Sequence, residues 1–86
     1  MDNYSVYDED EMVNVHFRTI AGNTVLQMFS KKDTVLHMKK SMMARLGLQR
    51  LDQFQMSYRG KSLQAEHKTL ADYGFQQNSR VEVTMK

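Results

Sequence analysis

The spacing of apolar residues changes twice along this chain, and the two changes constrain its fold more than any other feature. Residues 13–18 alternate between apolar and polar side chains, which is the pattern of a half-buried strand. From residue 35 the apolar residues are spaced as on one face of a helix, at Val35, Met38, Met42 and Leu46. Alternation then returns over residues 54–58 and 81–85. The sequence therefore predicts one helix between two groups of strands.

The first alternating run and residues 25–29 are predicted to form a β-hairpin, because Gly22-Asn23 between them is a turn signal. The orientation of residues 25–29 has two solutions. Either Leu26 and Met28 face outward and Gln27 enters the core, or they face inward and the two ends of the run are exposed. We favour the first solution.

The predicted helix has a signal at each end. Asp33 or Thr34 can serve as the N-cap, and Gly47 can close the last turn in the left-handed conformation. Met38 and Met42 make the apolar stripe of this helix rich in methionine, and we interpret the stripe as flexible core packing rather than as an adaptable binding surface.

The second half of the chain predicts three further strands. Residues 54–58 form one, Gly60 allows a turn into a very short one at Ser62-Leu63, and residues 81–85 form the last. A hairpin, a crossover helix and more strands predict an α+β fold of two layers, a mixed sheet with one helix packed across it. The right-handed crossover rule favours a last strand parallel to the first hairpin.

The net charge of +2 conceals an uneven distribution. Residues 1–11 contain five of the ten acidic residues and no basic one, so residues 12–86 carry 12 basic and 5 acidic groups. We predict an acidic, disordered N-terminal arm over 1–11 and one domain over 12–86. Two interpretations of the arm stay open: a solvated leader, or an intramolecular decoy that lies against the basic face and competes with acidic partners.

The composition also indicates the cellular compartment of the protein. The chain has no cysteine, which excludes a disulfide framework and fits an intracellular protein of the cytoplasm or nucleus. No apolar run is long enough to span a membrane, and no signal peptide opens the sequence. We therefore expect an intracellular monomer without a membrane partner.

Several short motifs resemble ubiquitin and its relatives, whose fold is the β-grasp. In chain order they are the hairpin turn at 19–24, Asp33-Thr34-Val35, Gly47-Leu48, Arg59-Gly60-Lys61-Ser62-Leu63 and, most specific, Thr69-Leu70-Ala71-Asp72-Tyr73-Gly74-Phe75. The resemblance extends from Met12 to Met85. It implies a ubiquitin-like β-grasp in which Leu70 fills the core, the Tyr73 hydroxyl caps the backbone of the loop and Phe75 closes the bottom.

The resemblance implies a protein that binds other proteins, and two departures from ubiquitin narrow the prediction. Covalent modifiers of this family end in a flexible Gly-Gly tail, whereas this sequence stops at Lys86. The positions that match ubiquitin's apolar patch hold Ile20, Ser57 and Thr84, of which only Ile20 is fully aliphatic. We predict a non-conjugated protein–protein interaction module with low affinity for ordinary ubiquitin receptors. The alternative is a ubiquitin- or SUMO-like covalent modifier whose Gly-Gly is missing from this chain.

Two surfaces are predicted to bind partners. The first is the open sheet face, with specificity from electrostatic complementarity, and its residues are Ile20, Ser57, Arg59, Lys61, Glu82 and Thr84. The second follows from a likeness to the SUMO branch, in which partners add a strand to the edge formed by the second strand, beside the helix. Its residues are Leu26, Met28, Lys31, Lys32, Lys39 and Lys40. It would take peptides with apolar and acidic residues, although edge lysines also protect a sheet from aggregation. Components of the ubiquitin pathway are further candidate partners.

No pattern in the sequence indicates catalysis or a cofactor. His16, His37 and His67 lie on different predicted elements, and no cysteine or paired carboxylate accompanies them. We therefore expect no enzyme activity, metal or cofactor. The lysines and arginines around the helix lack interleaved aromatic residues, so a nucleic-acid partner is not expected.

Overall fold

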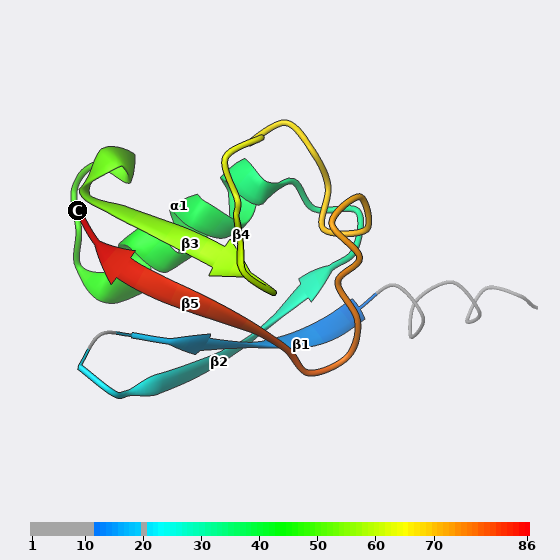
Figure 1. Ribbon diagram of the computed structural model, residues 1–86, viewed down its shortest axis with the longest axis horizontal. Helices are drawn as coiled ribbons and strands as arrows, with labels where there is room; N and C mark the ends of the chain where they lie inside the picture. Colours follow the sequence, from blue (N-terminus) through cyan, green and yellow to red (C-terminus); the bar gives the residue numbers. More distant parts are fainter. Residues whose placement is uncertain (1–11, 20) are drawn as a thin grey trace, which may run out of the picture.

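A curved sheet packed against one α-helix makes up the two layers of the computed structural model, which describes residues 12–19 and 21–86 (Figure 1). In chain order the elements are β1 (Met12–Arg18), β2 (Thr24–Ser30), α1 (Val35–Leu46), the 3-10 helix η2 (Leu51–Gln53), β3 (Phe54–Tyr58), β4 (Lys61–Ser62) and β5 (Ser79–Met85). The predicted α+β β-grasp architecture is confirmed. The acidic arm, residues 1–11, lies outside the described residues.

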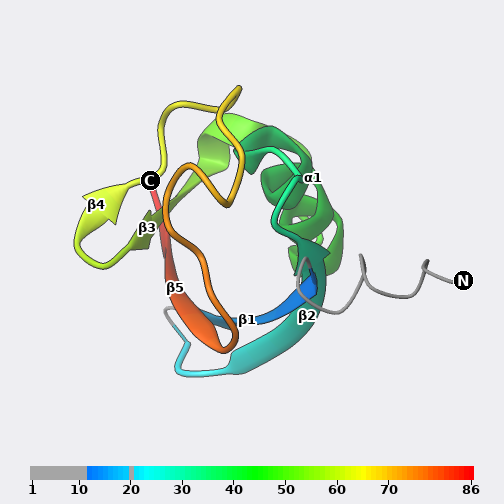
Figure 2. The ribbon, with the colours of Figure 1, turned by 90° about the vertical axis from the view of Figure 1, so that its right-hand side faces the viewer.

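The described part of the sheet has the strand order β2-β1-β5-β3-β4. β1 is antiparallel to β2 and parallel to β5, and β3 is antiparallel to both β5 and β4. The parallel pairing of the first and last strands is therefore as predicted. Seen along the strands, the sheet curves around α1, and β2 and β4 form its two edges (Figure 2).

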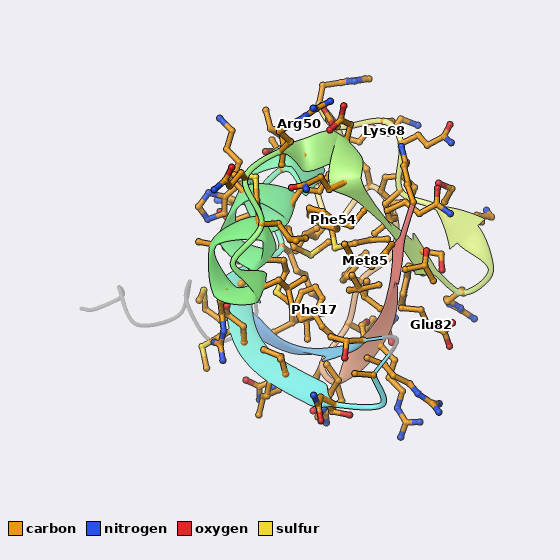
Figure 3. All side chains as sticks on the ribbon, turned by 90° about the vertical axis from the view of Figure 1, so that its left-hand side faces the viewer. Phe17, Arg50, Phe54, Lys68, Glu82 and Met85 are labelled. Atoms are coloured by element: carbon orange, nitrogen blue, oxygen red, sulfur yellow. The ribbon has the colours of Figure 1, made fainter. Side chains whose placement is uncertain are left out.

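The core lies between the concave side of the sheet and α1. Alternate strand residues enter it: Phe17 and Phe54 point into this space, and the Phe17 and Phe29 rings meet edge to face at a centroid distance of 5.9 Å (Figure 3). The buried apolar residues are Val13, Val15, Phe17, Phe29, Val35, Met38, Met42, Phe54, Met56, Tyr58, Leu63, Leu70, Phe75, Val81 and Val83. The methionine stripe is thus core packing, as interpreted, and the outward orientation of Leu26 and Met28 is confirmed. Gln27, expected in the core, is only half-buried, and its side chain accepts a hydrogen bond from Arg45.

The start of α1 is held by the loop that follows β4. Thr34 is the N-cap, and its hydroxyl accepts a hydrogen bond from the His37 N–H at 3.1 Å. The Val35 and Leu36 N–H groups donate to carbonyl oxygens of residues 68 and 66 at 2.8 and 3.1 Å. Hydrogen-bond donors that a helix start would leave unpaired are therefore satisfied from a distant part of the chain. At the other end Gly47 has φ +72°, the predicted left-handed C-cap.

The string Thr69–Phe75 holds the β2–α1 connection to the body of the fold. The N–H groups of Leu70 and Ala71 donate to the carbonyls of residues 33 and 31, each at 2.9 Å. The Tyr73 hydroxyl accepts from the Ala65 N–H at 3.3 Å, and Phe75 stacks on Tyr58 at a centroid distance of 4.2 Å. Leu70 and Phe75 are both buried. The roles implied by the resemblance for Leu70, Tyr73 and Phe75 are confirmed.

The same string contains a reciprocal cap. The Thr69 N–H donates to the Asp72 carboxylate at 3.0 Å, and the Asp72 N–H donates to the Thr69 hydroxyl at 3.1 Å. The bond from the Thr69 N–H holds the pKa of Asp72 below its usual value. This cap is therefore present above the ordinary pKa of a carboxyl group, and it is lost as the pH falls through the lowered pKa.

Four local features differ from the sequence-based predictions. β4 begins one residue earlier than expected, at Lys61, and β5 begins at Ser79 rather than at residue 81. Residues 51–53, for which no element was predicted, form η2. Lys39, expected on an outer face of the helix, is only 9% exposed because its stem packs inward and its ammonium group meets Glu66 at 3.2 Å.

Removing the partner of Lys39 should cost stability. Glu66→Ala leaves a buried ammonium without a counter-charge, and we expect a loss of about 1–2 kcal/mol, less than for a fully buried pair because Glu66 is partly exposed. Lys39→Met keeps the apolar stem without the charge and should be nearly neutral. In the Lys39→Met background, Glu66→Ala should cost almost nothing in urea unfolding. An equal loss in both backgrounds would show that the ion pair is not the cause.

Arg59 occupies a backbone conformation that suits glycine. Its φ of +55° and that of Gly60, +82°, form a tight turn between β3 and β4. Arg59→Gly should therefore stabilise the fold by about 0.5–1 kcal/mol, since glycine reaches this conformation without strain. Gly60→Ala at the neighbouring position should destabilise it. A lower melting temperature for Arg59→Gly would mean that the arginine side chain stabilises the turn in another way.

Candidate functional site

The helix covers one face of the sheet and leaves the other free. On this free side the paired strands place residues in rows. Leu26 of β2 lies opposite His16 of β1, and His16 lies opposite Arg80 of β5. We call this surface the open face, and its residues are Asn14, His16, Arg18, Thr24, Leu26, Met28, Ser57, Arg80, Glu82 and Thr84. Figure 3 shows Glu82 pointing away from the core on the outer side of β5.

The open face carries positive charge without matching partners. Arg18 lies directly opposite Glu82 in the β1–β5 register, yet the two side chains form no ion pair. Within residues 12–19 and 21–86, Arg80 makes no ion pair either. Guanidinium groups stay charged at any physiological pH and are more weakly hydrated than ammonium groups. They are therefore available for carboxylates from outside the domain.

Two adjoining hollows shape the open face. The first has a volume of about 470 Å³ and lies over β2, β1 and β5; we call it the arginine hollow, and its side chains include His16, Arg18, Thr24, Arg80 and Glu82. The second has a volume of about 520 Å³ and lies next to the β3–β4 turn; we call it the turn hollow, and it is lined by Ser57, Arg59, Gly60, Arg80 and Glu82, among others. Arg80 and Glu82 border both hollows. A partner that enters either hollow therefore contacts Arg80.

The structure brings together part of the first predicted surface. Ser57, Arg59 and Glu82 line the turn hollow, and Lys61 follows in β4. Thr84 lies farther along β5, opposite Gln55 of β3 and outside both hollows. Ile20 lies outside the described residues.

The second predicted surface is divided between different sides of the molecule. Leu26 and Met28 belong to the open face, away from α1, whereas Lys39 is buried against Glu66 on the helix. Lys40 is exposed on α1, and Lys31 and Lys32 lie in the turn after β2.

The helix side that faces β2 instead presents His37 and Arg45. The His37 ring meets Phe29 edge to face, and the Arg45 guanidinium donates to the Gln27 side chain at 3.2 Å. Positions 37 and 39 are about 200° apart around a helix, which explains why Lys39 faces elsewhere. The six residues of the second predicted surface therefore do not form one groove.

Sequence reasoning named Glu82 of the arginine hollow but missed His16, Arg18, Thr24 and Arg80. The alternation of β1 did place His16 and Arg18 on one face, and alternation in the last strand does the same for Arg80 and Glu82. The register in which β1 pairs with β5 could not be predicted from the sequence. This register places His16 opposite Arg80, and so it brings the pair from β1 and the pair from β5 together in one cluster.

The histidines are dispersed, as the sequence suggested. His16 Nε2 lies 3.1 Å from the Asn78 side-chain oxygen, His37 packs on Phe29, and His67 is exposed in a loop. Among the described residues, no three metal-binding side chains converge. The exposed Arg50–Asp52 pair lowers the pKa of Asp52, chiefly through a hydrogen bond, and lies away from the open face. The described helices include none of the length and apolar character that a bilayer-spanning segment requires.

Comparison with known proteins gives one family. The family model of the ubiquitin family matches residues 15–86, which is most of the chain and includes all the strands and helices described above except the first three residues of β1. Domains of this kind are generally non-enzymatic modules. No curated protein matches the chain significantly.

Proposed function

The chain belongs to the ubiquitin family, and from this membership we propose that it is a non-conjugated protein–protein interaction module that docks its partner through the open face. One observation supports this role most. The open face combines arginines that have no ion-pair partner in the described chain with two apolar side chains that are more than half exposed, whereas α1 covers the opposite face.

The energetics of such a surface favour selective rather than tight binding. Leu26 and Met28 offer apolar contact area, worth at most about 1.5–3 kcal/mol for each side chain that becomes fully buried. Exposed charge pairs add about 0.2–1 kcal/mol each and accelerate association. Specificity then comes from the position of charges across the face.

Photo-crosslinking tests this proposal. The full chain would carry a benzophenone amino acid at Thr84 or Thr24 on the open face, or at Lys40, which is exposed on α1, as the matched control. In extract of the cells that produce the protein, we expect discrete protein adducts from the open-face positions and none from Lys40. Adducts from Lys40 alone, or equal adducts from all three positions, would refute docking through the open face.

The same extract tests the alternative, in which the protein is a covalent modifier. Without illumination, an antibody against the chain should detect one species of the mass of the free protein. A ladder of heavier species that survives denaturation would show conjugation and would replace the non-covalent proposal.

A further inference from the structure

Resting on this docking role, we propose that the half of the open face formed by β2, β1 and β5 binds an extended acidic segment of a partner protein. One apolar side chain of that segment packs on Leu26 and Met28. Its carboxylates bind Arg18 and Arg80 in the arginine hollow. This site differs from both surfaces expected from the sequence.

The apolar part of the site is the outer side of β2. Leu26 and Met28 are 52% and 55% exposed, and they are successive residues on the same face of that strand. Their cross-strand neighbours on β1 are His16 and Asn14, which leave the two side chains uncovered. Neighbouring exposed apolar side chains on a sheet face are a contact for an apolar group of a partner.

The charged part begins one strand further in. Arg80 lies beside His16, and Arg18 occupies the next outward position of β1. Arg18 and Arg80 both line the hollow of about 470 Å³, and neither makes an ion pair within the described chain. Two guanidinium groups around one hollow can each form paired hydrogen bonds with a carboxylate.

The register fixes the spacing that a ligand needs. Leu26, His16 and Arg80 form one row across three strands, so Leu26 and Arg80 are roughly 10 Å apart at a strand spacing of about 4.8 Å. A peptide in the extended polyproline II conformation rises about 3.1 Å per residue and, with three residues per turn, places side chains three positions apart on the same side. A ligand that crosses the strands therefore needs an acidic residue three positions from its apolar residue.

The composition of the face favours a protein segment over nucleic acid. Among the described residues, the open face has no phenylalanine, tyrosine or tryptophan on which a base could stack. Glu82 also lines the hollow and repels any anion that lies against it, which disfavours a backbone with a phosphate at every nucleotide. A peptide can place its carboxylates beside the arginines and its apolar residue beside β2.

The test measures fluorescence polarisation of a labelled twelve-residue peptide, in which one leucine is followed three positions later by two glutamates in a Gly/Ser background. Two control peptides replace the glutamates by glutamine or the leucine by serine. The protein is the full chain at low salt. We expect the original peptide to bind, both control peptides to bind at least about fivefold more weakly, and added salt to weaken binding.

Matched protein variants locate the site. Arg18→Gln/Arg80→Gln should weaken binding about fivefold or more, since each exposed charge pair is worth up to about fivefold. Leu26→Ser should have a similar effect. Arg59→Gln/Lys61→Gln removes the same charge beside the turn hollow and should change the affinity less than twofold. Thermal melts confirm that each variant is folded.

The outcomes separate this inference from the docking role. A larger loss from Arg59→Gln/Lys61→Gln than from Arg18→Gln/Arg80→Gln would overturn the inference, while crosslinking from Thr84 would still support docking. Failure of crosslinking at both open-face positions would refute the docking role itself. Tighter binding of an oligothymidylate than of the peptide would overturn the choice of ligand.

The chain's own arm is the remaining alternative occupant. Residues 1–11 contain the required spacing, with Val6 three positions before Glu9 and Tyr7 before Asp10. A full chain with amides in place of the acids at 8–11 serves as the comparison. If the peptide binds only this variant, the arm rather than a partner occupies the face, and the inference is overturned.

Discussion

Leu70→Ala should lower the free energy of unfolding by about 3 kcal/mol, within the range of 2–5 kcal/mol found for buried leucines. Leu70 has no exposed surface, and its main chain accepts hydrogen bonds from the N–H groups of Tyr73 and Phe75. The substitution leaves a cavity at the point where the Thr69–Phe75 string meets the core. For a domain of this size, the melting temperature should fall by more than about 10 °C.

The matched control is the same substitution on the surface. Leu26→Ala removes identical atoms from a side chain that is half exposed, and it should cost less than about 1 kcal/mol. Urea unfolding of the two variants gives the comparison directly. Similar losses at both positions would contradict the role of the string as a core element.

Ser79→Ala should cost about 2 kcal/mol, the second largest effect expected. The Ser79 hydroxyl accepts from the Gln76 N–H at 2.9 Å, donates to the Gln76 carbonyl at 2.8 Å and lies 3.1 Å from the Tyr58 hydroxyl. Alanine leaves the Gln76 N–H without this acceptor. It also leaves the Tyr58 hydroxyl with only the Gly74 carbonyl, at 3.4 Å. Buried polar groups without partners cost about 1–3 kcal/mol each.

Two further variants isolate the cause of that loss. Ser62→Ala, on the exposed strand β4, removes a hydroxyl with no hydrogen bond in the described chain and should change stability by less than about 0.5 kcal/mol. In a Tyr58→Phe background, Ser79→Ala should cost less stability, because the Tyr58 hydroxyl, one of the groups that would lose a hydrogen-bond partner, is already absent. An undiminished loss in that background would assign the effect to Gln76 alone.

The strands and the helix could be predicted from the sequence because the spacing of apolar residues along the chain matches the spacing of the residues that are buried. In β1 and β3 every second residue is buried, and α1 begins and ends at the residues whose side chains and backbone can cap it. Local patterns of this kind need no knowledge of distant contacts. The roles within the Thr69–Phe75 string were predicted from its resemblance to ubiquitin and its relatives, because its partners include residues 31 and 33 and Tyr58, outside the string.

Features that depend on distant contacts could not be predicted. Lys39 is buried because Glu66, far along the chain, lies within reach of its ammonium group. The arginine hollow exists because β5 pairs with β1 in a register that aligns Arg80 with His16. The separation of Leu26 and Met28 from the helix lysines has a related cause: the outward side of β2 is the side away from α1.

Docking of a partner on the open face can be tested directly, because the chain's methionines provide probes on different sides of the molecule. Met28 is exposed on that face, Met43 is partly buried on α1, and Met38, Met42 and Met56 are in the core. The decisive measurement is the ¹³C-methyl methionine spectrum of the full chain, with and without the partner identified by crosslinking. We predict that the Met28 signal shifts or broadens while that of Met43 stays in place. A shift of Met43 with Met28 unchanged would contradict docking through the open face.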